Sequence, residues 1–144
     1  VIAGTKASVE RASALAAARK LKAIPLKVSA PFHCALMAPA AERMRAELEA
    51  VAFGPLEFPV VSNVEARPND DPRRVAELLV RQIDGAVRWQ QTVELMAAQG
   101  VDRALEIGPG KVLAGLVKRI DKRISVHSVG DPESVARLAE ARGA

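Results

Sequence analysis

The sequence predicts an α/β fold that is layered around a mainly parallel sheet. Short runs of β-forming residues alternate with segments of helical periodicity along the chain, an order typical of parallel sheets. Glycine, proline and polar residues separate these segments. With 144 residues the chain can form one compact core, and it has no apolar run long enough to cross a bilayer.

The N-terminal third is expected to contain two strands and two helices. Residues 1–3 and 23–28 are apolar runs of strand type, and the alanine-rich residues 5–20 favour a helix. Residues 38–50 predict an amphipathic helix because their apolar side chains recur every three or four positions, and Pro39 fits its first turn. The first strand reads as if it were entered part-way, so we expect further chain upstream of it.

The other two thirds continue the alternation. Asp71 and Pro72 supply an N-cap and a first-turn proline for a helix, Gly85 ends that helix, and residues 65–71 before it form a polar loop. A buried strand is expected at residues 103–107. The remaining strands are predicted at 56–62 and 124–129, and the helices at 72–84, 90–99, 111–120 and 131–141.

Composition narrows the kinds of site. The single cysteine, Cys34, excludes an internal disulfide and suits a reducing, cytoplasmic setting. With two distant histidines it makes no zinc-type ligand cluster, and we expect no metal or other cofactor. The net charge is +4, and Lys111, Lys118 and Lys122 form a basic stripe. Because aromatic residues for base stacking are scarce, this stripe is either a solvated helix face or a contact for an acidic protein, and not a nucleic-acid site.

His33 follows a predicted strand, at the edge of the sheet where ligands of α/β folds bind. A histidine there is either a structural residue or a group that transfers protons near neutral pH. Its neighbour Cys34 is not expected to use it as a base, because adjacent side chains in extended backbone point apart. The second histidine, His127, lies in a predicted strand and is interpreted as structural.

Gln82 lies in the last turn of the predicted helix 72–84. Its main-chain carbonyl has no partner within the helix and can accept a hydrogen bond from a histidine ring, while the negative helix end favours an imidazolium. Such a carbonyl would replace the aspartate of a conventional triad. The alternative is a partly exposed glutamine without a role. No GxSxG motif occurs in the chain, so the chain has no recognisable serine nucleophile elbow.

The junction from Glu106 to Lys111 contains two glycines between a predicted strand and a helix. The Walker spacing is absent, Val112 stands where serine or threonine would bind magnesium, and Leu113 stands where a dinucleotide motif has its third glycine. We therefore interpret the glycines as residues of a tight turn. Weak anion binding at the start of the helix is the alternative.

Five segments in the same order resemble the malonyl-CoA:acyl carrier protein transacylases of bacterial fatty-acid synthesis. They contain the histidine region, a strand ending in Asn63, and the helix end at Gln82. The segments are 24–41 (IPLKVSAPFHCALMAPAA), 59–64 (PVVSNV), 79–82 (LVRQ), 87–89 (VRW), and 96–101 (MAAQGV) with 106–113 (EIGPGKVL).

The resemblance implies part of a layered acyltransferase with an α/β-hydrolase-like core. Residues 1–28 would be the C-terminal part of a small ferredoxin-like subdomain, and residues 29–144 the C-terminal part of the large α/β subdomain. It implies transfer of a malonyl group from malonyl-CoA, through a serine ester, to the phosphopantetheine thiol of acyl carrier protein. His33 matches the catalytic histidine, Gln82 matches the residue whose main-chain carbonyl orients the ring, and Asn63 matches a position near the site without an assigned role.

The chain departs from the family in what it lacks. The serine elbow, the arginine that pairs with the malonyl carboxylate and the oxyanion-hole glutamine belong to the family's N-terminal part and have no counterpart here. The chain alone is therefore expected to be inactive and to need that missing N-terminal half as a partner. Phe32 fits malonyl selectivity, because related polyketide acyltransferases that accept methylmalonyl tend to have a smaller residue before the histidine.

Two alternatives stay open. One is a fragment of a polyketide synthase acyltransferase domain, which shares the chemistry, although residues 34–37 favour the free-standing enzyme. The other is a non-catalytic α/β module that binds an anion or a partner protein. The module predicts a closed sheet, whereas the transacylase fragment predicts an exposed apolar face.

Overall fold

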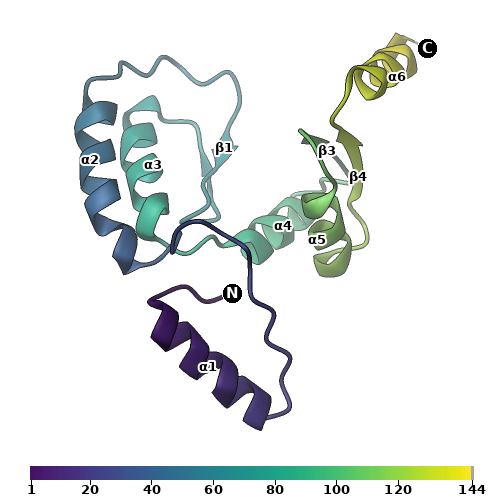
Figure 1. Cartoon of the computed structure of the whole chain (residues 1–144). Coiled ribbons are helices and arrows are strands. Elements are labelled where there is room, and N and C mark those ends of the chain that lie inside the picture. The colour runs from purple at the N-terminus through teal and green to yellow at the C-terminus, as the bar shows by residue number, and fades with distance from the viewer. Residues whose placement is uncertain (144) are drawn as a thin grey trace. The chain divides into compact units, whose positions relative to one another are not determined.

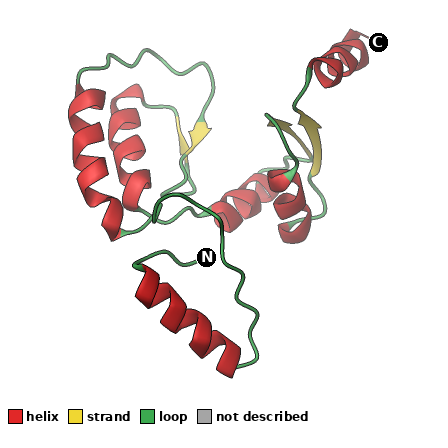
Figure 2. Ribbon diagram, in the orientation of Figure 1, coloured by secondary structure: helices red, strands yellow, loops and turns green. Residues whose placement is uncertain are grey.

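The structure is a computed structural model that describes residues 1–143, and the chain divides into two compact units, Val1–Arg88 and Trp89–Ala144 (Figure 1). Helices make up most of the regular structure, and the strands are short (Figure 2). No helix among the described residues combines the length and the apolar character needed to span a membrane. The mixture of helices and sheet confirms the α/β class in outline, whereas the expected sheet is only partly formed.

The first unit begins with α1 (Lys6–Ala18), which confirms the predicted alanine-rich helix. The Thr5 hydroxyl accepts a hydrogen bond from the Ser8 main-chain N–H, at the N-cap. The strands predicted at residues 1–3 and 23–28 are wrong, since both segments are irregular and their apolar side chains are exposed. A strand needs a neighbour to pair its main-chain N–H and C=O groups, and no described segment pairs with these two.

Two helices pack against each other in this unit (Figure 1). The helix α2 (Ala38–Glu49) follows a 3₁₀ turn, Ala35–Met37, and has Pro39 in its first turn as predicted. The helix α3 (Val75–Asp84) follows a second 3₁₀ turn, Pro72–Arg74, and buries Leu78 and Val80.

Both ends of the helical segment formed by Pro72–Arg74 and α3 match the prediction. The Asp71 carboxylate accepts a hydrogen bond from the Arg73 main-chain N–H at its start, and Gly85 is the C-cap. The capping residues of the sequence therefore fixed the position of α3 correctly.

The strand predicted at residues 56–62 shrinks to β1 (Val60–Val61), which pairs antiparallel with β2 (Pro68–Asn69). The loop predicted at 65–71 therefore contains a short strand, which is a correction. The Ser62 N–H donates to the Arg67 carbonyl over 3.1 Å and closes the turn between the strands. Pro59 limits β1, because a proline has no N–H for a strand ladder.

The second unit contains the parallel strands that the sequence predicts. The strands β3 (Arg103–Ile107) and β4 (Ser125–Val129) pair in parallel, and α5 (Val112–Ile120) connects them. The flanking helices are α4 (Trp89–Ala98) and α6 (Pro132–Gly143).

The core of this unit is formed by Val93, Val117 and Ile124, with Trp89 and Met96 packed against them. The expectation that residues 103–107 form a buried strand is wrong in the described structure, because the side chain at its end, Ile107, is 83% exposed. The described strands form two separate two-stranded sheets, one parallel and one antiparallel, so a mainly parallel sheet is not formed.

Candidate active site

His33 lies in the segment that enters α2, and it contacts the C-terminal end of α3. Its φ is +60°, a left-handed conformation that costs a non-glycine residue about 1–2 kcal/mol. In this conformation two donors of the same residue bond to one helix end. The main-chain N–H donates to the Ile83 carbonyl over 3.2 Å, and ring Nδ1 donates to the Gln82 carbonyl over 2.8 Å.

These two bonds satisfy two of the carbonyls at the α3 end. The last four carbonyls of a helix have no N–H partner in the next turn. The Arg81 carbonyl accepts from the Gly85 N–H over 3.0 Å, and the next two carbonyls, of Gln82 and Ile83, both accept from His33. A residue 49 positions away in the sequence therefore caps the helix.

The contact with a carbonyl determines where the ring carries its proton. A carbonyl oxygen only accepts, so the neutral ring has its hydrogen on Nδ1, and Nε2 keeps a lone pair. His33 is exposed, which leaves this ring accessible to a reacting group. When Nε2 takes a proton, both ring nitrogens become donors, and the bond from Nδ1 to the Gln82 carbonyl can stay in place. The arrangement can therefore act as a general base and then as a general acid.

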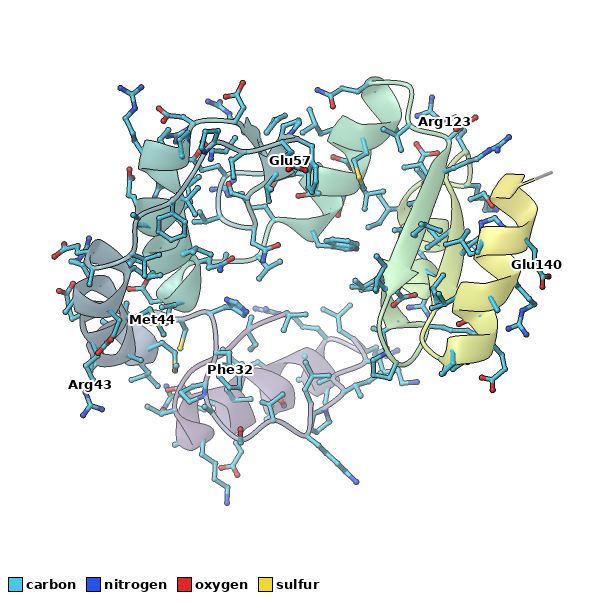
Figure 3. All side chains as sticks on the ribbon, turned by 90° about the horizontal axis from the view of Figure 1, so that it is seen from above. Phe32, Arg43, Met44, Glu57, Arg123 and Glu140 are labelled. Carbon is cyan, nitrogen blue, oxygen red and sulfur yellow. The ribbon has the colours of Figure 1, made fainter. Side chains whose placement is uncertain are left out.

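Phe32 and Cys34 lie on either side of His33 in the sequence. The Cys34 thiol donates to the Pro31 carbonyl over 3.1 Å, away from the histidine, in line with the expectation that the two do not form a pair. The side chain of Phe32, labelled in Figure 3, is 46% exposed.

The side chain of Gln82 has a partner of its own. Its Oε1 accepts a hydrogen bond from Asn63 Nδ2 over 3.1 Å, and the Asn63 carbonyl accepts from the Arg88 N–H over 2.8 Å. Asn63 and Gln82 also adjoin a mainly apolar cavity of about 200 Å³, whose lining includes Leu78 and Leu79. Sequence reasoning placed Asn63 near the site, and the structure gives the contact that it makes there.

Glu65 is a residue that the sequence analysis missed. Its carboxylate accepts from Arg81 Nη1 over 2.6 Å and from Arg74 Nη2 over 2.9 Å. The hydrogen bond from Arg81 and then that from Arg74 hold the pKa of Glu65 below its ordinary value. The spacing of the two arginines, seven residues apart on one helical face, was the available signal.

The glycine junction before α5 is a tight turn, as interpreted from the sequence. Gly108 and Gly110 have φ of +127° and +97°, which only glycine adopts readily. The Glu106 carboxylate accepts from the main-chain N–H groups of Leu113 and Ala114 over 2.8 and 3.1 Å. The Glu106 carboxylate thus binds the free N–H groups at the start of α5, where the alternative interpretation placed an external anion.

The pKa of Glu106 reflects this position. Desolvation acts to raise it, but the hydrogen bonds from the two main-chain N–H groups and from the Ser128 hydroxyl together hold the pKa below its ordinary value. Of the basic stripe, Lys111 is the N-cap of α5, Lys118 lies in its last turn and Lys122 follows it, and all three lysines are exposed. His127 lies at an exposed position of β4, paired with Leu105.

The mixed helical and sheet fold thus carries an exposed histidine whose ring is held at Nδ1, an arrangement that can accept and return a proton at Nε2. No protein-family model matches the chain. It is 45% identical to the malonyl CoA-acyl carrier protein transacylase of Escherichia coli K12 over 141 residues, which are 97% of this chain and 46% of that protein. It is 43% identical to the transacylase of Bacillus subtilis over 136 residues, 94% of this chain and 43% of that protein.

Solved structures agree with these relatives. An acyl-carrier-protein S-malonyltransferase from Bartonella henselae matches with a TM-score of 0.89 and 42% identity, over 98% of this chain and 45% of that one. A malonyl-transacylase in complex with its type II polyketide acyl-carrier protein matches with a TM-score of 0.89 and 45% identity, over 96% and 45%.

The chain is thus a homologue of the malonyl-CoA:acyl carrier protein transacylases, corresponding to their C-terminal part. It spans somewhat less than half the length of the curated relatives that it matches.

Proposed function

We propose that this chain provides the histidine part of an active site that transfers malonyl groups from malonyl-CoA to acyl carrier protein in bacterial, cytoplasmic fatty-acid biosynthesis. The observation that carries the proposal is the 2.8 Å hydrogen bond from His33 Nδ1 to the Gln82 carbonyl. It leaves Nε2 of an exposed ring available as the base. The names of the relatives, and the similarity of this chain to them, support the same activity.

The proposed reaction has two halves. His33 Nε2 takes the proton of a serine hydroxyl while the serine oxygen attacks the malonyl thioester, and the proton passes to the departing coenzyme A sulfur. In the second half, Nε2 takes the proton of the carrier protein's phosphopantetheine thiol, whose sulfur attacks the serine ester. The proton then returns to the serine oxygen. The Gln82 carbonyl keeps the ring in one tautomer throughout, the role that an aspartate has in a conventional triad.

The serine of this reaction lies outside the 144 residues, because they contain no GxSxG elbow. We propose that the N-terminal part of the enzyme supplies it and covers the apolar surface of this chain. Among the described side chains more large apolar residues are exposed than buried, for example Phe58 at 70%, Ile107 at 83% and Val112 at 71%. Such exposure favours a fragment of a larger fold over a self-contained binding module.

The same proposal includes the division of the fold. Residues 1–28 would complete a small ferredoxin-like subdomain, and residues 29–144 would belong to a large subdomain with an α/β-hydrolase-like core. The exposed Lys111, Lys118 and Lys122 would attract an acidic carrier protein. No cofactor has a part in the reaction, because malonyl-CoA and the carrier thiol are its substrates.

The test is complementation with the N-terminal part of the E. coli relative, followed by an assay of malonyl transfer from malonyl-CoA to holo acyl carrier protein. The chain alone is expected to transfer nothing, and the complemented protein to be active. A His33→Ala variant of the complemented protein should lose activity by about 10²–10⁴-fold, the usual contribution of a general base. Activity of the chain alone would refute the proposed division of labour, and an unaffected His33→Ala variant would refute the role of the histidine.

The same assay should be run with a polyketide acyl-carrier protein, because one structural homologue is a transacylase bound to its type II polyketide acyl-carrier protein. The alternative function is malonyl transfer in polyketide synthesis, with the same residues in the same roles. Comparing kcat/KM for a fatty-acid carrier and a polyketide carrier separates the two. A preference for the polyketide carrier would assign the chain to that pathway.

A further inference from the structure

We infer that Asn63 is a positioning residue, which acts through the side chain of Gln82 to keep His33 in its reactive tautomer. The catalytic consequence of this inference rests on the proposed function, but the effect on the histidine ring does not. Among the described residues no hydrogen bond joins Asn63 to His33 directly, so we expect its influence to pass through Gln82. That residue bonds at both ends, with its side chain to Asn63 and its main-chain carbonyl to His33.

The hydrogen bond between Asn63 and Gln82 lies at the last turn of α3. The last turn of a helix frays, because its carbonyls have no intrahelical partners. Asn63 is bonded on both sides of this helix end. Its Nδ2 donates to Gln82 Oε1 over 3.1 Å before the end, and its carbonyl accepts from the Arg88 N–H over 2.8 Å after it. The carbonyl that holds the His33 ring therefore sits in a turn fixed from outside the helix.

Asn63 is itself held firmly enough to serve as an anchor. It lies in the turn between β1 and β2, which the bond from the Ser62 N–H to the Arg67 carbonyl closes. Within the same turn, Glu65 is bonded to Arg81 on α3 itself. Turn and helix are thus tied together twice, by an ion pair on one side and by the amide pair of Asn63 and Gln82 on the other.

The chemistry of the pair explains why an asparagine suits this position. Gln82 Oε1 needs a donor, which the Asn63 amide supplies and an alanine does not. An aspartate of the same shape has no donor, but the Gln82 amide can rotate and donate from Nε2 to the carboxylate. A loss in Asn63→Ala and a recovery in Asn63→Asp would therefore separate the hydrogen bond from mere packing.

The experiment measures the ring tautomer of His33 by ¹⁵N NMR of the histidine-labelled chain, at a pH where the ring is neutral. The chain has two histidines, and His127, in β4 of the other unit, is the reference within each sample. The variants are Asn63→Ala, Asn63→Asp, Gln82→Ala and the double variant of the two alanine changes, all of which keep the Gln82 carbonyl. Ser62→Ala is the matched control, because it removes a hydrogen bond of the same turn, which the Ser62 hydroxyl accepts from the Glu65 N–H, and leaves the bond between Asn63 and Gln82 intact.

Each single variant is expected to lower the ratio of the Nδ1–H to the Nε2–H tautomer of His33 about fivefold, the effect of one ordinary hydrogen bond. The double variant should show the same shift as either single one, because both remove one shared interaction. Ser62→Ala and His127 should show no change. A tautomer unchanged in Asn63→Ala, additive shifts in the double variant, or no recovery in Asn63→Asp would each overturn the inference.

The kinetic arm separates this inference from the proposed function. In the complemented enzyme, Asn63→Ala should lower kcat for malonyl transfer about fivefold and leave KM unchanged, because a positioning residue acts on the base and not on substrate binding. If the complemented wild type transfers no malonyl group while the tautomer shifts as expected, the proposed function fails and the positioning role stands. If malonyl transfer is normal and the tautomer does not respond, the positioning role alone fails.

Discussion

Replacing Gly85 by alanine should damage the helix end that holds His33. A methyl group at this position would collide with the Arg81 carbonyl oxygen and lie 3.0 Å from Val64 Cγ2. The Arg81 oxygen belongs to the main chain and cannot move alone, since it accepts the Gly85 N–H and directly precedes the Gln82 and Ile83 carbonyls. Any relief of the collision therefore shifts the acceptors of His33.

The magnitude follows from two contributions. Overpacking against a rigid backbone costs about 1–3 kcal/mol, and a weakened capping hydrogen bond costs about 1 kcal/mol. We expect Gly85→Ala to lower the free energy of unfolding by about 2–4 kcal/mol when these add. The matched control is Gly54→Ala in the same unit, where the new methyl group meets nothing within 4 Å. That change should stay within about 0.5 kcal/mol of the parent.

The assay is urea unfolding followed by circular dichroism, together with the His33 ring signals in NMR. Gly85→Ala should move the urea midpoint down and perturb His33 more than His127. Equal midpoints for Gly85→Ala and Gly54→Ala would refute the steric reasoning. A lower midpoint with unperturbed His33 signals would instead show that the helix end is not what holds the ring.

Three further predictions concern selectivity, acid stability and the carrier. Phe32→Ser in the complemented enzyme should raise the use of methylmalonyl-CoA relative to malonyl-CoA about tenfold, in line with the worth of one methyl group, and an unchanged ratio would remove Phe32 as a determinant. The hydrogen bond from the Arg123 side chain (labelled in Figure 3) lowers the pKa of Asp121 from 3.8 to about 2, so this carboxylate stabilises the fold above pH 3.8 and loses its effect as the pH falls towards 2. Asp121→Asn should accordingly flatten the stability profile measured between these pH values, and a profile identical to the parent's would argue against the pair. Reversing the charge of Lys111, Lys118 and Lys122 together should weaken the salt dependence of carrier turnover, and a salt dependence equal to that of the parent would exclude them as a docking site.

The sequence determined the helices of this protein and predicted the contact between His33 and the Gln82 carbonyl that the structure contains. Helices were predictable because their hydrogen bonds are local and their caps are visible, as at Asp71 and Gly85. It was predictable, for the same reason, that the Gln82 carbonyl has no partner within the helix, since this follows from the position of the helix end. The role of that contact in catalysis is still a prediction.

Only the tertiary structure decided which strand-like segments pair and what surrounds the histidine. Residues 23–28 have the apolar character of a strand but no described neighbour to bond with, whereas β3 and β4 pair with each other. The hydrogen bonds from Asn63 to Gln82 and from Arg81 to Glu65 join residues 19 and 16 positions apart, and no sequence periodicity predicts such pairs. The physical reason is common to both cases: a helix satisfies its backbone within one segment, but strands and side-chain networks depend on partners that folding brings together.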